Sequence, residues 1–333
     1  MDDIITLDHG SGGKKTSELI EKILLPAFDN NMLSELGDGA LIRGNEKLVF
    51  STDSFVVSPL FFPGGDIGKL SVCGTVNDIS VCGAIPKYLS LSFIIEEGLK
   101  LSDFKTIIES IAKTAKSCGV SIVTGDTKVV ERGKGDGIFI NTAGIGFSYM
   151  DSLSIKNIEK GDKVIISGNI GEHGVAVLLA RTGLLENASI VSDCAPLNQL
   201  TELVLEYGEK IKIMRDPTRG GVATTLCEFV EGTTLCIELE QQQLPITASV
   251  ESACDLLGLD PLYSANEGKL LVVCASEIAD DLVEKMKILE IGRNSAIIGE
   301  VTENYAGKVA LKTRFGGVRG LTKLQGAQLP RIC

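Results

Sequence analysis

Hydrophobic and polar positions alternate along the chain in two series of short elements. In the first half, helical spacing of apolar residues predicts a helix over residues 16–25, after a glycine-rich opening loop. The same reasoning predicts strands over 47–54, 87–96, 120–130 and 137–147 and helices over 67–82 and 102–118, the last with Ser102 as N-cap and Gly119 at its C-terminal end.

A polar stretch without periodicity, residues 151–160, predicts a domain boundary. Beyond it the pattern predicts strands over 160–168, 235–240, 269–275, 295–301 and 308–312 and helices over 175–182, 197–211, 221–230, 249–257 and 277–289. Strands and helices do not alternate strictly, so we expect an α+β fold rather than a doubly wound sheet. The predicted division is 1–150, 151–314 and a tail, 315–333.

Four glycines in the predicted tail, at 316, 317, 320 and 326, make it unsuited to a packed core. Pro330 favours an extended tip, and the final residue is Cys333. Fully stretched, the tail would reach about 55–60 Å. We therefore expect a thiol carried on a flexible tether, although a frayed end with an incidental cysteine is the simpler reading.

Composition narrows the functional classes. The 333 residues are 44% hydrophobic and 23% charged, as in folded proteins, and a net charge of −12 disfavours nucleic acid or an anionic membrane as partner. The first residues carry no basic and apolar signal pattern, and no apolar run reaches about 18 residues, so we expect neither a secretory signal nor a membrane span. The nine cysteines form no CxxC pair, which predicts reduced thiols and a cytoplasmic protein.

Familiar nucleotide and nucleophile motifs do not fit. The GGKKT segment at 12–16 lacks P-loop spacing, and GNIGEHG at 168–174 has the wrong glycine spacing for a dinucleotide fold and predicts a tight strand-to-helix turn. No GxSxG elbow occurs, and the two histidines, His9 and His173, are too isolated to predict a zinc site.

Aspartates recur instead after strand-like runs or in loops of the first half: Asp38, Asp53, Asp78 and Asp126. Each alone is an ordinary turn residue. Together they offer the hard oxygen ligands that Mg²⁺ prefers, and the glycines at 10–13 and at Gly64 and Gly65 offer backbone N–H groups to phosphate. This predicts a magnesium–nucleotide site without a P-loop. Lys128, which follows the GDT turn, and Glu267, in the small-residue turn ANEGK, are candidates for phosphoryl contact and proton transfer, or else ordinary salt-bridge or turn residues.

Eight segments, spread along nearly the whole chain, resemble one family. They are HGSGG (9–13), GDGA (37–40), STDSFVVSPLFFPGGDIGKL (51–70), GTVNDISVCGA (74–84), VTGDTKVV (123–130), RDPTRGGVAT (215–224), ANEGK (265–269) and PRIC (330–333). The chain resembles the HypE family of [NiFe]-hydrogenase maturation factors, carbamoyl dehydratases in the superfamily of aminoimidazole ribonucleotide synthetase, selenophosphate synthetase and thiamine-monophosphate kinase.

The resemblance implies a two-domain synthetase fold, with an N-terminal sheet that pairs across a homodimer and a C-terminal α/β sandwich. It implies ATP with Mg²⁺, a HypF-type carbamoyltransferase that loads Cys333, and a HypC–HypD-type iron scaffold that receives a cyano group. Glu267 would then be the base and Lys128 would stabilise charge. The nucleotide residues implied are Asp38, Thr52, Asp53, Gly64, Gly65, Asn77, Asp78, Asp126 and Asp216, of which Asp38, Asp78 and Asp126 would hold metal.

Two alternatives stay open. A kinase for a small molecule, such as selenide or a ribonucleotide, would share the fold, but selenophosphate synthetases carry a reactive residue in the first glycine-rich segment, and here the first cysteine is Cys73. A nucleotide-responsive binding protein would use the tail only as a docking peptide. Replacement of Cys333 distinguishes the three hypotheses, namely a carbamoyl dehydratase, a small-molecule kinase and a binding protein.

Overall fold

The computed structural model describes residues 4–11, 13–34, 39–148, 150, 153–184 and 189–324. The chain folds into two compact units. The first comprises Met1–Phe61, Gly65–Ile79 and Ala84–Ser148, and the second Phe62–Gly64, Ser80–Gly83 and Tyr149–Cys333. The predicted boundary at 151–160 is therefore slightly late, and two short segments of the first half belong to the second unit. Pattern reasoning could not assign them, because their contacts are with residues far along the chain.

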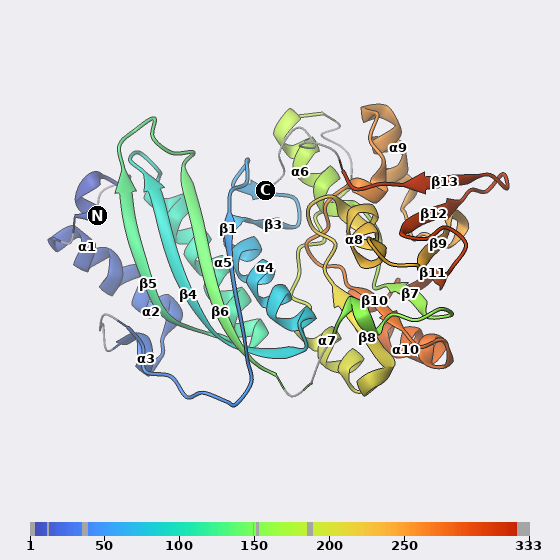
Figure 1. Ribbon diagram of the computed structural model, residues 1–333. Helices are drawn as coiled ribbons and strands as arrows, with labels where there is room; N and C mark the ends of the chain where they lie inside the picture. Colours follow the sequence, from blue (N-terminus) through green and yellow to red (C-terminus); the bar gives the residue numbers. More distant parts are fainter. Residues whose placement is uncertain are drawn as a thin grey trace. The chain divides into compact units, whose positions relative to one another are not determined.

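The N-terminal unit is a four-stranded sheet covered on one face by two helices (Figure 1). The strand order is β1 (Leu48–Phe55), β6 (Ile138–Ser148), β4 (Ala84–Glu96) and β5 (Ser121–Val130), and only β4 and β5 are parallel. The covering helices are α4 (Ile67–Val81) and α5 (Leu101–Cys118). Helix α4 lies close to β6 because glycines face it: a Cβ at Gly146 would come within 2.2 Å of Ile79.

The opposite face of this sheet carries no helix, and we call it the open face (Figure 1). Period-two alternation places Leu48, Phe50 and Ile94 on it, with exposed fractions of 52%, 68% and 46%. On the same face Tyr88 and Phe147 meet edge to face at 6.1 Å between ring centroids. The open face is thus a largely apolar surface on an otherwise well-packed unit.

The remaining N-terminal elements are short. They are η1 (Leu7–Gly10), α1 (Lys14–Leu19), the π-helical η2 (Ile20–Leu24), α2 (Leu25–Phe28), α3 (Asn31–Ser34) and the paired β2 (Phe61–Phe62) and β3 (Gly65–Asp66). Gly119 ends α5 in the left-handed conformation, φ 70°, as predicted. The prediction of Ser102 as its N-cap was wrong: the helix begins at Leu101, and the N-cap is Lys100.

The C-terminal unit is a seven-stranded sheet between two layers of helices. Its strands are, in spatial order, β13 (Val318–Leu321), β12 (Lys308–Lys312), β9 (Cys236–Glu240), β11 (Ala296–Thr302), β7 (Lys163–Ile166), β10 (Leu271–Cys274) and β8 (Ile211–Arg215). Its helices are α6 (Glu172–Thr182), α7 (Asn198–Leu205), α8 (Gly221–Val230), α9 (Ala248–Leu257) and α10 (Ala279–Met286). Short 3-10 turns complete it: η3 (Ile155–Asn157), η4 (Gly208–Lys210), η5 (Gln241–Gln243), η6 (Pro261–Tyr263), η7 (Ser276–Ile278) and η8 (Glu290–Gly292).

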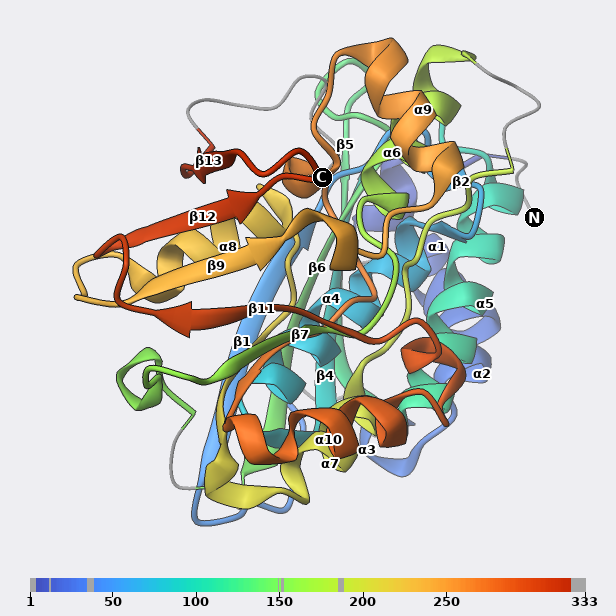
Figure 2. The same cartoon turned by 90° about the vertical axis from the view of Figure 1, so that its right-hand side faces the viewer.

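Strand alternation produces these layers. Along β10, Leu271 and Val273 join the core beneath α8, while Val272 joins the core formed with α7 and α10. Figure 2 shows α8 behind the neighbouring strands β12, β9 and β11. The α+β prediction is confirmed, because strand pairing is mainly antiparallel in both sheets.

Two predictions about this unit were wrong. The helix expected over 197–211 ends at Leu205, and Ile211 starts strand β8, because its side chain is buried in the core with α7 and α10. The flexible tail expected from Phe315 is wrong for residues 318–321, since β13 pairs with β12 and Leu321 is buried. The Tyr263 hydroxyl then fixes Thr322, accepting from its N–H (3.2 Å) and donating to its C=O (2.9 Å).

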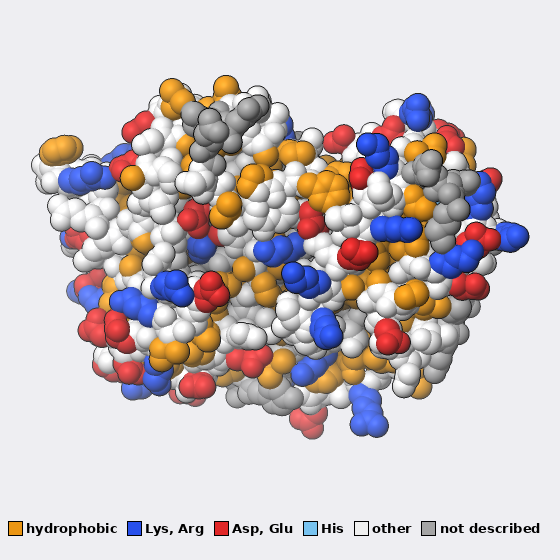
Figure 3. Space-filling model, turned by 180° about the vertical axis from the view of Figure 1, so that it is seen from behind, with side chains coloured by type: hydrophobic (Ala, Val, Ile, Leu, Met, Phe, Trp, Pro, Cys, Tyr) orange, Lys and Arg blue, Asp and Glu red, His pale blue; other side chains and the backbone are white. Residues whose placement is uncertain are grey.

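The surface charges and the hydrophobicity of the helices complete the description. Acidic and basic side chains are interspersed over the face drawn in Figure 3. Among the described residues, no helix combines the length and the apolarity needed to cross a bilayer.

Candidate active-site residues in the two units

Strand β1 and helix α4 bring two of the predicted aspartates to one side of the N-terminal sheet. The Asp78 carboxylate, on α4, accepts a hydrogen bond of 2.7 Å from the Ser51 hydroxyl. Asp53, two residues further along β1, points to the same side and accepts from the N–H of Ser54 at 2.8 Å. Gly74, one helical turn before Asp78, faces Asp53: a Cβ there would lie 3.7 Å from its Oδ2. The two carboxylates therefore share the space between β1 and α4. Asp78 lies in the helix expected over 67–82 and Asp53 in the strand expected over 47–54, so the description of Asp78 as a loop or strand-end residue was wrong.

Thr52 lies on the open face instead. Its hydroxyl donates to the carbonyl of Thr142 at 3.0 Å, and the Asn141 amide lies 3.3 Å from it. That amide also donates to the Asp53 carbonyl at 2.9 Å, so it ties β6 to this part of β1. Asn77 is buried within α4 with an exposed fraction of 1%. Its side chain is therefore not a group that reaches into solvent.

Asp126 and Lys128 lie together at the other end of the sheet. Both are on β5, two residues apart, so their side chains emerge on the same face. The Lys128 ammonium is 3.0 Å from Asp126 Oδ1, and both side chains are more than half exposed. An exposed pair of this kind contributes little stability, which leaves both groups available for a ligand.

The sheet order separates the two acidic positions. Strands β6 and β4 lie between β1 and β5, which places the edge strands roughly 14 Å apart at about 4.8 Å per strand. Asp78 and Asp126 of one unit therefore cannot ligate one ion. Consistent with this, no three His, Cys, Asp or Glu residues gather in a metal-binding group anywhere in the described ranges.

Several predicted residues fall elsewhere. Asp38 and Cys333 lie outside the described residues. Gly64 is packed against the chain rather than open: a Cβ on it would come 2.5 Å from the Ser192 carbonyl, at φ +92°. Its lack of a side chain is therefore explained by backbone packing. Gly65 begins β3 in the N-terminal unit.

In the C-terminal unit, Asn266 joins the loops that carry Asp216 and Glu267. Its side-chain Oδ1 accepts a hydrogen bond from the N–H of Gly171 at 2.7 Å, and its side-chain Nδ2 donates to the carbonyl of Pro217 at 3.0 Å. Its own N–H also binds the Pro217 carbonyl, at 3.2 Å. Asp216 and Glu267 are themselves nearly buried, with exposed fractions of 7% and 5%. These two predicted residues are thus brought together by a third that the sequence did not single out.

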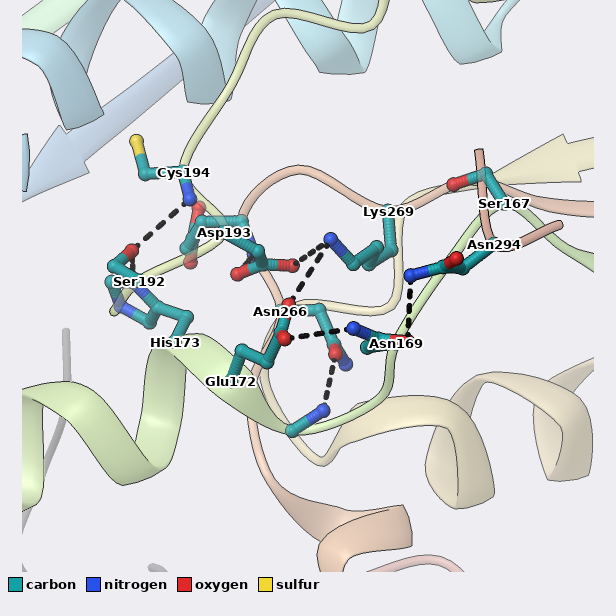
Figure 4. Close-up of polar contacts among 12 residues, drawn as sticks. Ser167, Asn169, Glu172, His173, Ser192, Asp193, Cys194, Asn266, Lys269 and Asn294 are labelled. Atoms are coloured by element: carbon teal, nitrogen blue, oxygen red, sulfur yellow. Dashed lines mark hydrogen bonds and ion pairs between the residues drawn. The ribbon is translucent and has the colours of Figure 1, made fainter. Parts of the chain in front are cut away.

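A cluster of charged side chains lies in the same unit, near Asn266 (Figure 4). The Lys269 ammonium is 3.4 Å from Asp193 Oδ2 and 3.5 Å from Glu172 Oε2. The Asp193 side chain is fully buried, and that of Lys269 is 10% exposed. Asn169 donates to Glu172 at 3.0 Å. We call Glu172, Asp193 and Lys269 the buried charge cluster.

His173 borders this cluster and is neutral near pH 7. Burial lowers the pKa of His173 to about 4, although the charge of Asp193 acts in the opposite direction. Its Nδ1 lies 2.8 Å from the Ser192 hydroxyl, which also accepts from the N–H of Cys194. Ser192 is buried and hydrogen-bonded to main chain, so this Ser–His contact is structural rather than a nucleophile with its base.

The sequence offered weak signals for these residues. The GNIGEHG segment forms the predicted strand-to-helix turn, with Gly171 at φ +85° before α6. The sequence predicts no role for Glu172 and His173 beyond that turn, and none for Asp193. An acidic residue in the small and apolar run IVSDCAPL is the one signal that could have marked Asp193.

Comparisons with known proteins agree with this architecture. The family of AIR synthase related proteins matches twice, with its N-terminal domain over residues 36–148 and its C-terminal domain over 159–312. The carbamoyl dehydratase HypE of Cupriavidus necator is 47% identical over 332 residues, covering 99% of this chain and 95% of that protein.

Two solved structures are similar throughout. A crystal structure of the hydrogenase maturation protein HypE in complex with ATP matches with a TM-score of 0.94 at 46% identity, covering 98% of this chain and 99% of that one. A chain in the crystal structure of a HypE–HypF complex matches with a TM-score of 0.80 at 50% identity, covering 92% and 99%.

Proposed function

Because the chain belongs to the HypE family of carbamoyl dehydratases, we propose that it dehydrates an S-carbamoyl group on its own Cys333 to an S-cyano group at the expense of ATP. The structural observation that carries the proposal is the 264–269 loop, which holds an almost fully buried Glu267 between fixed neighbours. We further propose that the cyano group becomes a ligand of the [NiFe]-hydrogenase iron.

The reaction needs an activated oxygen and a base. An amide oxygen is a poor leaving group, and ATP supplies the phosphoryl group with which that oxygen departs as phosphate. The C–O bond breaks, the carbon–nitrogen bond becomes triple, and the nitrogen loses both protons. Glu267 is our choice for the base that takes an N–H proton, since it is a nearly buried carboxylate whose main-chain N–H and carbonyl are both held by hydrogen bonds.

The N-terminal residues fit a magnesium–nucleotide site. Carboxylates at Asp53, Asp78 and Asp126 are hard oxygen donors of the kind Mg²⁺ prefers, and Mg²⁺ neutralises triphosphate charge when bound. Asp38 would add a fourth carboxylate, and Thr52 and Asn77 would support the site. Lys128, exposed beside Asp126, would stabilise charge developing on the phosphoryl or amide oxygen.

A second copy of the chain would complete this site. The open face is apolar, and Phe50 on its edge strand β1 is 68% exposed, which favours a homodimer formed by this surface. A two-fold axis parallel to the strands would stack the β5 edge of one copy over the β1 edge of the other. Asp126 and Lys128 lie on the open face, since β5 pairs them with Ser92 and Ile94 of β4, so they would then approach strand β1 of the partner, which a single sheet keeps apart from β5.

The partners we propose follow from the same chemistry. A HypF-type carbamoyltransferase would load Cys333, and a HypC–HypD-type scaffold would carry the iron that receives the cyano group. We place this chemistry in the cytoplasm, because the tail thiol must stay reduced to be loaded.

The test is mass spectrometry of the C-terminal peptide after incubation with the carbamoyltransferase, carbamoyl phosphate and ATP. We expect the carbamoyl adduct first and the cyano adduct after ATP is added. Cys333→Ser should abolish both adducts while the fold and ATP binding remain. An adduct that never loses water in the presence of ATP contradicts the proposal, and unchanged adducts in the variant would assign them to another residue. Hydrogenase maturation that survives Cys333→Ser would favour a docking peptide, and phosphorylation of a free small molecule would favour a kinase.

A further inference from the structure

The buried charge cluster is unusual because it adds charge where apolar packing would be more stable. Asp193 is completely buried, and its Oδ2 has no hydrogen-bond partner among the residues that the structure describes. Lys269, the cation that pairs with Asp193, is shared with Glu172. Burying ions carries a desolvation penalty that apolar residues of similar volume would avoid, so a cluster of this kind is weak evidence for a stabilising role.

Asp193 contacts Glu267 through the main chain. Its Oδ1 accepts the N–H of Glu267 at 3.1 Å. The Glu267 carbonyl in turn accepts the N–H of Ala195, at 3.3 Å. The peptide of the proposed base is therefore held on both sides by the same short segment, residues 193–195.

The residues that flank Glu267 are fixed in the same way. Asn266 is held by Gly171 and Pro217, as described above. Gly268 packs so tightly that a Cβ there would lie 1.9 Å from the Asp193 carbonyl. Lys269 closes the segment with its ion pair to Asp193. Each of the four residues from 266 to 269 thus has a contact that fixes it.

We infer that Asp193 is a positioning residue for Glu267, one carboxylate oxygen holding the Glu267 peptide while the other is balanced by Lys269. This inference rests on the proposed function. A general base must be placed within a few tenths of an ångström of the proton it removes, and a displacement of about 1 Å can cost about 100-fold in rate. Positioning of the base would explain why these charges are present in the core although they add little stability.

The inference predicts a specific order among variants. Asp193→Ala removes the acceptor, and the dehydration rate constant should fall roughly 10- to 100-fold while the KM for ATP stays within about 2-fold. Asp193→Asn keeps one acceptor oxygen, for which the Glu267 N–H and Lys269 compete. Adding Lys269→Met removes the competitor, so D193N/K269M should be faster than D193N alone.

Single-turnover dehydration of carbamoylated protein, followed by mass spectrometry of the tail peptide, measures these rates. Melting temperature and calorimetric ATP binding on each variant identify any that fail to fold. Asp281→Asn is the matched control, since Asp281 is an exposed partner of Lys285 in the same unit, and we expect its rate to be unchanged.

The decisive comparison repeats Asp193→Ala in a Glu267→Gln background. If Asp193 acts through Glu267, the second substitution should add less than about 2-fold to the loss, whereas independent roles would multiply. Multiplicative losses, an unaffected rate in folded D193A, or a D193N/K269M variant slower than D193N would overturn the inference. If Glu267→Gln alone keeps full activity, the proposed base assignment is wrong. Wild-type protein that never forms the cyano adduct would instead reject the proposed function.

Discussion

The titration of His173 offers a quantitative test of the buried environment beside the charge cluster. The side chain is fully buried, and burial lowers its pKa from 6.5 to about 4. We propose to replace it with Asn, whose side chain can keep the contact that Nδ1 makes with the Ser192 hydroxyl but does not titrate.

The sign of the effect follows from proton linkage. The unfolded chain takes up a proton at this histidine near pH 6.5, and the folded protein does so only near pH 4. The stability associated with neutral His173 is present above pH 6.5 and is lost as the pH falls to about 4. A difference of about 2.5 pH units at about 1.4 kcal/mol each corresponds to about 3 kcal/mol.

The free energy of unfolding of wild type and of His173→Asn is measured by urea unfolding at a series of pH values from about 7.5 down to about 4. The variant should be less stable at neutral pH, because the smaller side chain leaves part of the ring volume empty. Its stability should nevertheless fall by about 3 kcal/mol less on acidification. Parallel profiles for the two proteins, or a His173 resonance that titrates near pH 6.5 in NMR spectra, would refute a buried neutral imidazole. The variant identifies that resonance, since the chain has two histidines.

Four further outcomes are expected. Glu267→Gln should leave calorimetric ATP binding near normal and slow dehydration at least about 100-fold, and a normal rate would remove Glu267 from the base role. Asp126→Asn should weaken magnesium–ATP binding about 10-fold or more by calorimetry, and unchanged affinity would exclude Asp126 from the site. Burial raises the pKa of Cys254 to about 11 and of Cys274 to about 12, so an alkylating reagent at pH 8, well below both, should spare these thiols; rapid labelling of either would contradict their burial. Phe50→Asp should convert the proposed homodimer to monomer in analytical ultracentrifugation, and a persistent dimer would place the interface elsewhere.

Much of the fold could be predicted from local pattern. The strand predicted over 308–312 coincides with β12, and the helix predicted over 67–82 with α4 to within a residue, because apolar periodicity and glycine signals are local properties. Predictions failed where burial or strand pairing, and not the local pattern, determined the secondary structure. Ile211 continues a helical pattern in the sequence but is a core residue of strand β8, and β13 forms in a glycine-rich segment because β12 offers it an edge.

For the candidate site, too, the sequence determined one part and the tertiary structure another. The sequence determined which residues carry suitable chemistry, such as Glu267 and the aspartates, because carboxylate and ammonium groups can be read from the residue names. Only the tertiary structure decided their grouping. Sheet order keeps Asp78 and Asp126 apart within one unit. Long-range hydrogen bonds bring Asp193 beside Glu267, across 74 positions of chain. Contacts over such separations depend on how the loops pack against one another, and no local spacing encodes them.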